Sequence, residues 1–144
     1  MPRDGRLSEM PVMARARGGP PSRGVRMRPL LFCCSGASDV GHIADSAARR
    51  LDSMGAAQLG CLAGIGGRVL SHLAAARRAP ELMAIDGCEC NCARRTLEEA
   101  GLTCAIHVRV TDNGIAKGAA QDREAGIRRV LQDCLTLLEN RAAE

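Results

Sequence analysis

The sequence predicts a small three-layer α/β domain, with a mostly parallel sheet of about four strands and flanking helices. From residue 29 onward, short apolar segments alternate with segments whose apolar residues recur at helical spacing. The connections between these segments are short, as in parallel sheets with right-handed crossovers. The 144 residues include one Phe and neither Trp nor Tyr, so aliphatic side chains and alanine must form the core. A single domain of this length can bury such a core.

The first strand and the first helix are expected between residues 29 and 55. Residues 29–33 form a short apolar run, which predicts a strand. Ser38 is suited to cap the N-terminus of the following helix, and Gly55 is suited to end it. The apolar residues of this helix recur at helical spacing: Val40, Ile43, Ala44, Ala47, Leu51 and Met54.

A second strand and a second helix follow. The strand is expected over residues 57–62, and the glycine-rich residues 63–67 are expected to form a turn. This turn lacks the Lys-Ser/Thr ending of a phosphate-binding loop, so we interpret it as a tight connection. It leads into a helix whose predicted apolar face consists of Val69, Leu70, Leu73 and Ala74.

The third strand and the third helix flank the most unusual segment of the chain. Residues 82–85 are apolar on both faces, which is typical of a central strand in a parallel sheet. Residues 88–92 then hold three cysteines within five residues. A helix is expected from about residue 90 to residue 100, and its inward positions are Ala93, Leu97 and Ala100.

A fourth strand and a C-terminal helix complete the pattern. Ile106, Val108 and Val110 alternate with His107 and Arg109, so one face of this strand is more polar than the other. The last helix is amphipathic, with an apolar stripe of Ile127, Val130, Leu131, Cys134, Leu135 and Leu138.

Three segments are expected along the chain. Residues 1–28 mix Arg, Pro and Gly without periodicity, and they are expected to be disordered. This segment holds seven Arg against two acidic residues; it carries +5 where the whole chain carries +4, so the other 116 residues sum to −1. Residues 29–118 are expected to form the α/β domain, and residues 119–144 a C-terminal amphipathic helix that packs on it.

The composition argues against a nucleic-acid partner and against a membrane-spanning protein. Aromatic side chains for base stacking are almost absent, and the excess of positive charge lies outside the expected domain. No apolar run approaches the roughly 20 residues that span a bilayer. The N-terminus also lacks the apolar stretch of a secretory signal, so a cytoplasmic location is expected. Clustered cysteines in that compartment serve metals or catalysis more often than disulfides. No protein partner is indicated.

Four of the eight cysteines are expected at one edge of the sheet. Cys34 follows the first strand, Cys61 closes the second, and Cys88 follows the third, with Cys92 four residues further on. Because the carboxyl ends of parallel strands meet at one edge, these thiols are expected to converge there. A tetrahedral Zn²⁺ site takes four soft ligands at about 2.3 Å, and this set supplies that number. The sequence therefore predicts a metal site, with zinc as the metal.

The other polar side chains near these positions have simpler interpretations. Cys33, Cys104 and Cys134 are interpreted as small buried hydrophobic residues. Cys90 stays open: it replaces Cys92 as a ligand, resolves a disulfide, or has no role. Asp86 precedes the cysteines and is interpreted as organising their turn through hydrogen bonds to amides. The histidines, His42, His72 and His107, are assigned to the surface or to packing.

Three motifs follow one another along the chain: Cys34-Ser35-Gly36, Ala63-Gly64-Ile65-Gly66-Gly67 and Ala84-Ile85-Asp86-Gly87-Cys88-x3-Cys92-Ala93-x3-Leu97-x2-Ala100-Gly101. Together they resemble the DGC-domain family, whose members are described as zinc-binding proteins. The resemblance covers about residues 30–118. It implies zinc ligation by cysteine, carried over to Cys34, Cys61, Cys88 and Cys92, and it implies no particular reaction.

The chain departs from the family pattern in the first loop. Family members often carry a second cysteine there, where this chain has Ala37. If that thiol is a ligand elsewhere in the family, Cys33 or Cys90 would complete the site here.

A thiol-based function is the alternative to zinc binding. In that case Cys88 acts in an oxidoreductase or a sulfur-transfer protein, and Cys92 or Cys90 is its resolving partner. A thiolate at the N-terminus of a helix is reactive when it is exposed. No catalytic residue is assigned, and the sequence leaves open whether the protein is an enzyme.

Overall fold

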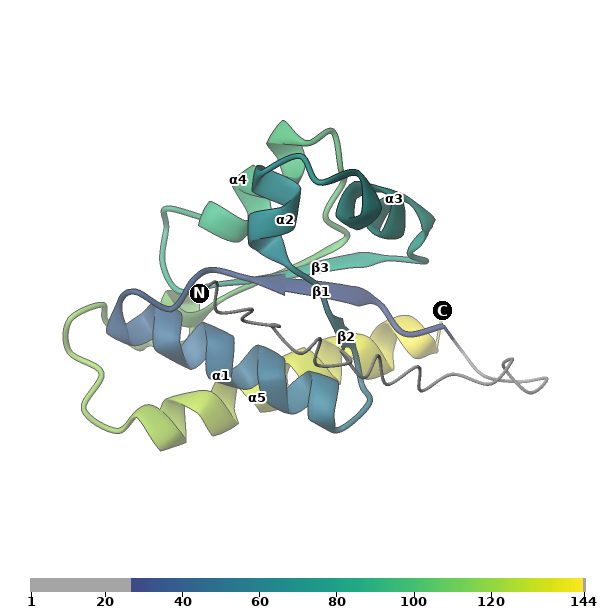
Figure 1. Cartoon of the computed structure of the whole chain (residues 1–144). Helices are drawn as coiled ribbons and strands as arrows, with labels where there is room; N and C mark the ends of the chain where they lie inside the picture. The colour runs from purple at the N-terminus through teal and green to yellow at the C-terminus, as the bar shows by residue number, and fades with distance from the viewer. Residues whose placement is uncertain (1–26, 144) are drawn as a thin grey trace, which may run out of the picture.

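The computed structural model describes residues 27–143, which form a four-stranded parallel sheet flanked by helices (Figure 1). The strand order is β2–β1–β3–β4, and every neighbouring pair is parallel. The bounds are Leu30–Cys33 for β1, Gln58–Leu59 for β2, Leu82–Asp86 for β3 and Ile106–Arg109 for β4. The predicted α/β class and parallel sheet are thus confirmed. The expected disordered segment lies, apart from its last two residues, outside the described part.

The helices form one layer on each face of the sheet (Figure 1). One layer contains α1, Asp39–Ser53, and α5, Arg123–Ala142. The other contains α2, Leu62–Gly66, α3, Leu70–Arg78, and α4, Cys92–Glu99. Each layer encloses its own cluster of buried apolar side chains, so the sheet lies between two cores. None of the helices in residues 27–143 is long and apolar enough to cross a bilayer.

Helix α1 begins and ends where its sequence predicts. The Ser38 hydroxyl accepts a hydrogen bond from the Gly41 amide at 3.1 Å, which satisfies one of the free amides of the first turn. Gly55 follows the helix with φ +75°, a conformation that glycine adopts without steric cost. The predicted apolar face of α1 is buried from Val40 to Leu51, but it is wrong at its last residue, Met54, which is the C-cap and is 58 % exposed.

Helix α5 packs against α1. Its residues Ile127, Val130 and Cys134 are buried in the core that α1 shares with the sheet. At the surface, the Arg50 guanidinium binds both carboxylate oxygens of Glu124 at 2.7 Å. The last helix therefore packs on the domain through its apolar residues, as expected. The expected boundary at residue 118 stays a prediction.

The segment between β2 and α3 differs from the predicted strand and turn. Strand β2 has only two residues, because Cys61 already caps a short helix. The glycine-rich stretch expected as a turn forms this helix, α2, instead. Val69 is the extended cap residue before α3 and is 45 % exposed, while Leu70 is 80 % exposed. The predicted inward face is therefore wrong at its start, and Leu73 and Ala76 are the buried residues of α3.

Candidate functional site

A pocket of about 180 Å³ lies at the carboxyl ends of β1 and β3, where the sequence predicts the site. The loop after β1, the start of α1 and residues 86–92 form its walls. Three of the four predicted zinc ligands line this thiol pocket: Cys34, Cys88 and Cys92. Cys90 lines it as well. Four thiols from two segments of the chain, the loop after β1 and residues 86–92, thus share one cavity.

The fourth predicted ligand, Cys61, lies elsewhere. Its thiol is exposed and accepts a hydrogen bond from the Gly64 amide at 3.3 Å, as the N-cap of α2. It lines a separate groove beside Phe32 and His72. Within residues 27–143, no three Cys, His, Asp or Glu side chains are arranged as a ready metal site. The four-cysteine ligand set therefore stays a prediction.

Asp86 fixes the helix that carries Cys92. Its carboxylate is 1 % exposed and accepts hydrogen bonds from the amides of Ala93, at 2.7 Å, and Arg94, at 3.1 Å. These are free amides of the first turn of α4, and a negative charge at this end of a helix is stabilising. The sequence predicts that Asp86 accepts hydrogen bonds from amides of the cysteine turn. In the structure it accepts them from amides of α4, the helix that follows.

His107, for which the sequence predicts only a surface or packing role, completes this arrangement. Its Nε2 atom lies 3.0 Å from Oδ2 of Asp86. The register pairs Ala84 with His107, so Asp86, two residues further along β3, is the diagonal neighbour on the same face. The contact between His107 and Asp86 can therefore be predicted, but only once the register of β3 and β4 is known.

Gly87 allows β3 to end directly against α1. A Cβ atom at this position would lie 2.7 Å from the Gly41 nitrogen and 2.9 Å from the Val40 carbonyl carbon. Its amide also donates a hydrogen bond to the Cys34 sulfur at 3.3 Å. Asp86, Gly87 and Cys88 thus have separate roles: the first caps α4, the second permits close approach, and the third lines the pocket.

Cys88 is the thiol whose pKa is lowered. The largest cause is a hydrogen bond from the backbone amide of Cys90, and the Cys90 thiol and the Lys117 charge add to it. The Lys117 Nζ atom lies 3.6 Å from the Cys88 sulfur. The pKa of Cys90 is raised, chiefly by its side-chain hydrogen bond to Cys88. Cys88 therefore holds negative charge more readily than Cys90 does.

The thiols of Cys33, Cys34 and Cys134 are less acidic because they are buried. Burial raises the pKa of Cys34, although the hydrogen bond that its sulfur accepts from the Gly87 amide acts in the opposite direction. Burial also raises the pKa of Cys33 to about 12, with the nearby Asp45 carboxylate contributing, and that of Cys134 to about 12. Cys33 and Cys134 pack against the apolar core, in agreement with their predicted role.

Asp39 holds the segment that carries Lys117 beside the pocket. Its carboxylate accepts hydrogen bonds from the amides of Gly118, at 2.9 and 3.0 Å, and Ala120, at 3.1 Å. These bonds lower the pKa of Asp39. Because Asp39 is the first residue of α1, the same helix start that forms one pocket wall also positions the pocket's lysine.

Asn91 separates Cys90 from Cys92 and delays the start of α4. It adopts the left-handed conformation, with φ 50° and ψ 43°, so the helix begins at Cys92, later than the expected residue 90. Its Oδ1 atom is buried and has no hydrogen-bond partner in the described part of the chain. The exposed thiols of Cys90 and Cys92 therefore lie on either side of a backbone reversal.

Comparison with known proteins connects the chain to a family. A family model described as the DGC domain matches residues 30–134. The anaerobic and virulence modulator AnvM of Pseudomonas aeruginosa is 34 % identical over 97 residues, which cover 67 % of this chain and 74 % of that protein. No solved structure matches the chain.

Proposed function

The chain belongs to the DGC-domain family, and we propose that its thiol pocket binds a zinc ion. The observation that carries the proposal is the convergence of Cys34, Cys88 and Cys92 on one cavity of about 180 Å³. Thiolates are ligands that zinc prefers, and amides of the surrounding backbone donate hydrogen bonds to the sulfur atoms of Cys34 and Cys88. The role we propose for the ion is structural or regulatory.

The fourth ligand distinguishes two forms of this site. Cys61 completes the set implied by the family resemblance, but the segment before α2 would have to move to bring it into the pocket. Cys90 already lines the pocket, so only its exposed side chain would have to turn inward. Either set of four cysteines leaves no coordination position for water, which is typical of structural zinc sites.

Metal analysis of variants in which one cysteine is replaced by serine tests the proposal. Protein purified under reducing conditions without added metal is expected to contain about one zinc per chain. Cys34→Ser, Cys88→Ser and Cys92→Ser are each expected to lose most of it, and the fourth ligand is whichever of Cys61→Ser or Cys90→Ser does the same. Cys104→Ser is the control, because its half-buried thiol bonds the Ile106 carbonyl outside the pocket. Less than about a tenth of a zinc per wild-type chain would contradict the proposal.

A second function, thiol-based oxidoreduction or sulfur transfer, is favoured by the surroundings of Cys88. Its sulfur lies 3.6 Å from the Lys117 ammonium, and the Cys90 thiol is hydrogen-bonded to it. A stabilised thiolate beside a second thiol is the arrangement of an attacking and a resolving cysteine. Cys92, in the same pocket, is the other candidate for the resolving role.

The pH dependence of alkylation tests this second function in metal-free protein. Only the thiolate reacts, so the rate rises with pH and levels off above the pKa. Because the pKa of Cys88 is lowered, its rate should level off at lower pH than the rate of an unperturbed cysteine. Lys117→Met should move this profile to higher pH, and Cys88→Ser should remove the fast phase. Thiols that all react slowly in metal-free protein, or that in the protein as purified react only after a metal has been chelated, would favour zinc binding instead.

A further inference from the structure

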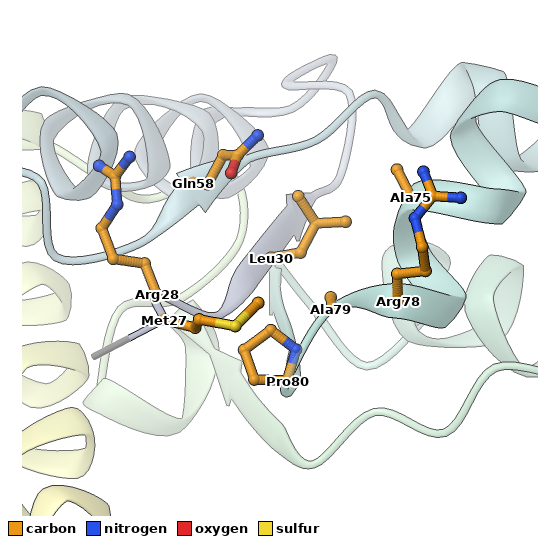
Figure 2. A pocket seen from close by; sticks show the side chains of 8 residues that line it. All are labelled: Met27, Arg28, Leu30, Gln58, Ala75, Arg78, Ala79 and Pro80. Carbon is orange, nitrogen blue, oxygen red and sulfur yellow. The ribbon is translucent and has the colours of Figure 1, made fainter. Parts of the chain in front are cut away.

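A second cleft lies at the opposite ends of the strands from the thiol pocket. It has a volume of about 370 Å³ and is formed where β1 begins, beside the end of α3 (Figure 2). Met27, Leu30 and Pro80 form its apolar centre, and Figure 2 shows Arg28 on one side of them and Arg78 on the other. This volume is at the lower end of the range for small-molecule sites, which is roughly 300–1,000 Å³.

The two arginines of this cleft have no acidic partner in residues 27–143. Other arginines of this region of the chain do, such as Arg50 with Glu124 and Arg94 with Glu98. The Arg28 guanidinium lies beside the Gly55 turn, on the β2 side of the cleft. Two guanidinium groups that bind no carboxylate of residues 27–143 are therefore available to an anionic ligand.

The cleft between the arginines is apolar. Met27 is 65 % exposed, and the short side chains of Ala75 and Ala79 leave the surface beside it open. Covering such surface is favourable, at about 25 cal/mol per Å² of apolar area removed from water. A ligand that fits the cleft therefore combines an apolar body with an anionic group.

We propose that this cleft binds a small organic carboxylate with an apolar body. Arginine binds carboxylates through paired N–H donors, with well-defined geometry. A monoanion fits better than a phosphate dianion, because α3 ends at Arg78 and the C-terminus of a helix carries partial negative charge. The chain's own first 26 residues are a poor occupant, since they hold six Arg against two acidic residues.

Titration with decanoate tests the proposal in the full-length protein. Binding is to be measured by calorimetry and by amide shifts in NMR spectra, which should concentrate at Leu30, Ala75 and Ala79. Arg28→Gln/Arg78→Gln is expected to weaken binding about tenfold or more, because it removes whichever guanidinium pairs with the carboxylate, together with the positive charge of the other. The matched control is Arg77→Gln/Arg95→Gln, which removes the same two charges from exposed positions outside the cleft and should weaken binding less than about twofold.

Several outcomes would overturn the proposal. Absence of decanoate binding up to about 1 mM would do so, since that corresponds to only about 4 kcal/mol of binding free energy. Equal weakening in the control variant would show a diffuse effect of charge rather than a site. Decanol binding as tightly as decanoate would remove the role of the arginines, and decyl phosphate binding more tightly would overturn the choice of a carboxylate.

Discussion

Replacing Gly87 with alanine is expected to lower the free energy of unfolding by about 3 kcal/mol or more. Overpacking of a core costs about 1–3 kcal/mol when side chains can adjust. At Gly87 the added Cβ meets backbone, with the Gly41 nitrogen at 2.7 Å, the Val40 carbonyl carbon at 2.9 Å and the Gly41 Cα at 3.0 Å. Relief therefore requires α1 and β3 to separate, which would also open the thiol pocket.

Urea denaturation of Gly87→Ala and of a matched glycine variant measures this effect. Gly66→Ala is the control, since its Cβ would meet only Thr96 Cγ2, at 3.6 Å, an ordinary contact. Gly66 is the last residue of α2, and alanine is the better helix former, so its variant should be neutral or slightly more stable. Equal stability of the two variants would show that β3 and α1 do not approach as closely as described.

The sheet and its two-sided helical cover follow from local patterns in the sequence. Residues 82–85 are apolar on both faces, and this pattern is sufficient to place them in a central strand, as β3 is. Ser38 and Gly55 indicate the two ends of α1, because the serine hydroxyl can cap the first turn and glycine adopts a positive φ after the last. The convergence of Cys34 and Cys88 follows as well, because they end neighbouring parallel strands.

The position of Cys61 could not be predicted in the same way. A glycine-rich stretch such as residues 63–67 is compatible with a turn or with a short helix, and helix α2 forms with Cys61 as its cap. That role ties the thiol to the Gly64 amide and places it in the groove of His72, not in the thiol pocket. One local choice between turn and helix thus moves a candidate ligand to a different surface.

Contacts between distant segments account for the other differences. Gly41 and Gly87 are far apart in sequence, and nothing local to either indicates that their backbones approach each other. The contact between His107 and Asp86 depends on the register of two strands joined through α4. Lys117 reaches Cys88 only because Asp39, on another element, holds the amides of the residues that follow Lys117.

Replacing Asp86 with alanine is expected to destabilise the domain by about 3 kcal/mol, and to affect the site more than the rest of the fold. The change leaves the amides of Ala93 and Arg94 without their acceptor, and it removes the partner of His107. Each hydrogen bond to a charged group contributes about 1.5–3 kcal/mol, and a buried group left unpaired costs a comparable amount. Asp86→Asn keeps one amide oxygen as an acceptor, so its effect should be smaller.

Hydrogen exchange at Ala93 and Arg94 distinguishes a local role of Asp86 from a general loss of stability. In Asp86→Ala these amides should exchange much faster, while amides in the middle of α1 change only as far as global stability falls. Asp112→Ala is the control, because its ion pair with Arg109 is exposed and contributes little. If Asp86 positions the start of α4, Asp86→Ala should also bind less zinc than wild type while it is still folded, since Cys92 is the first residue of that helix. If Asp86→Ala shows fast exchange at Ala93 but keeps the zinc content of the wild type, zinc binding does not depend on Cys92 being positioned by the cap that Asp86 provides.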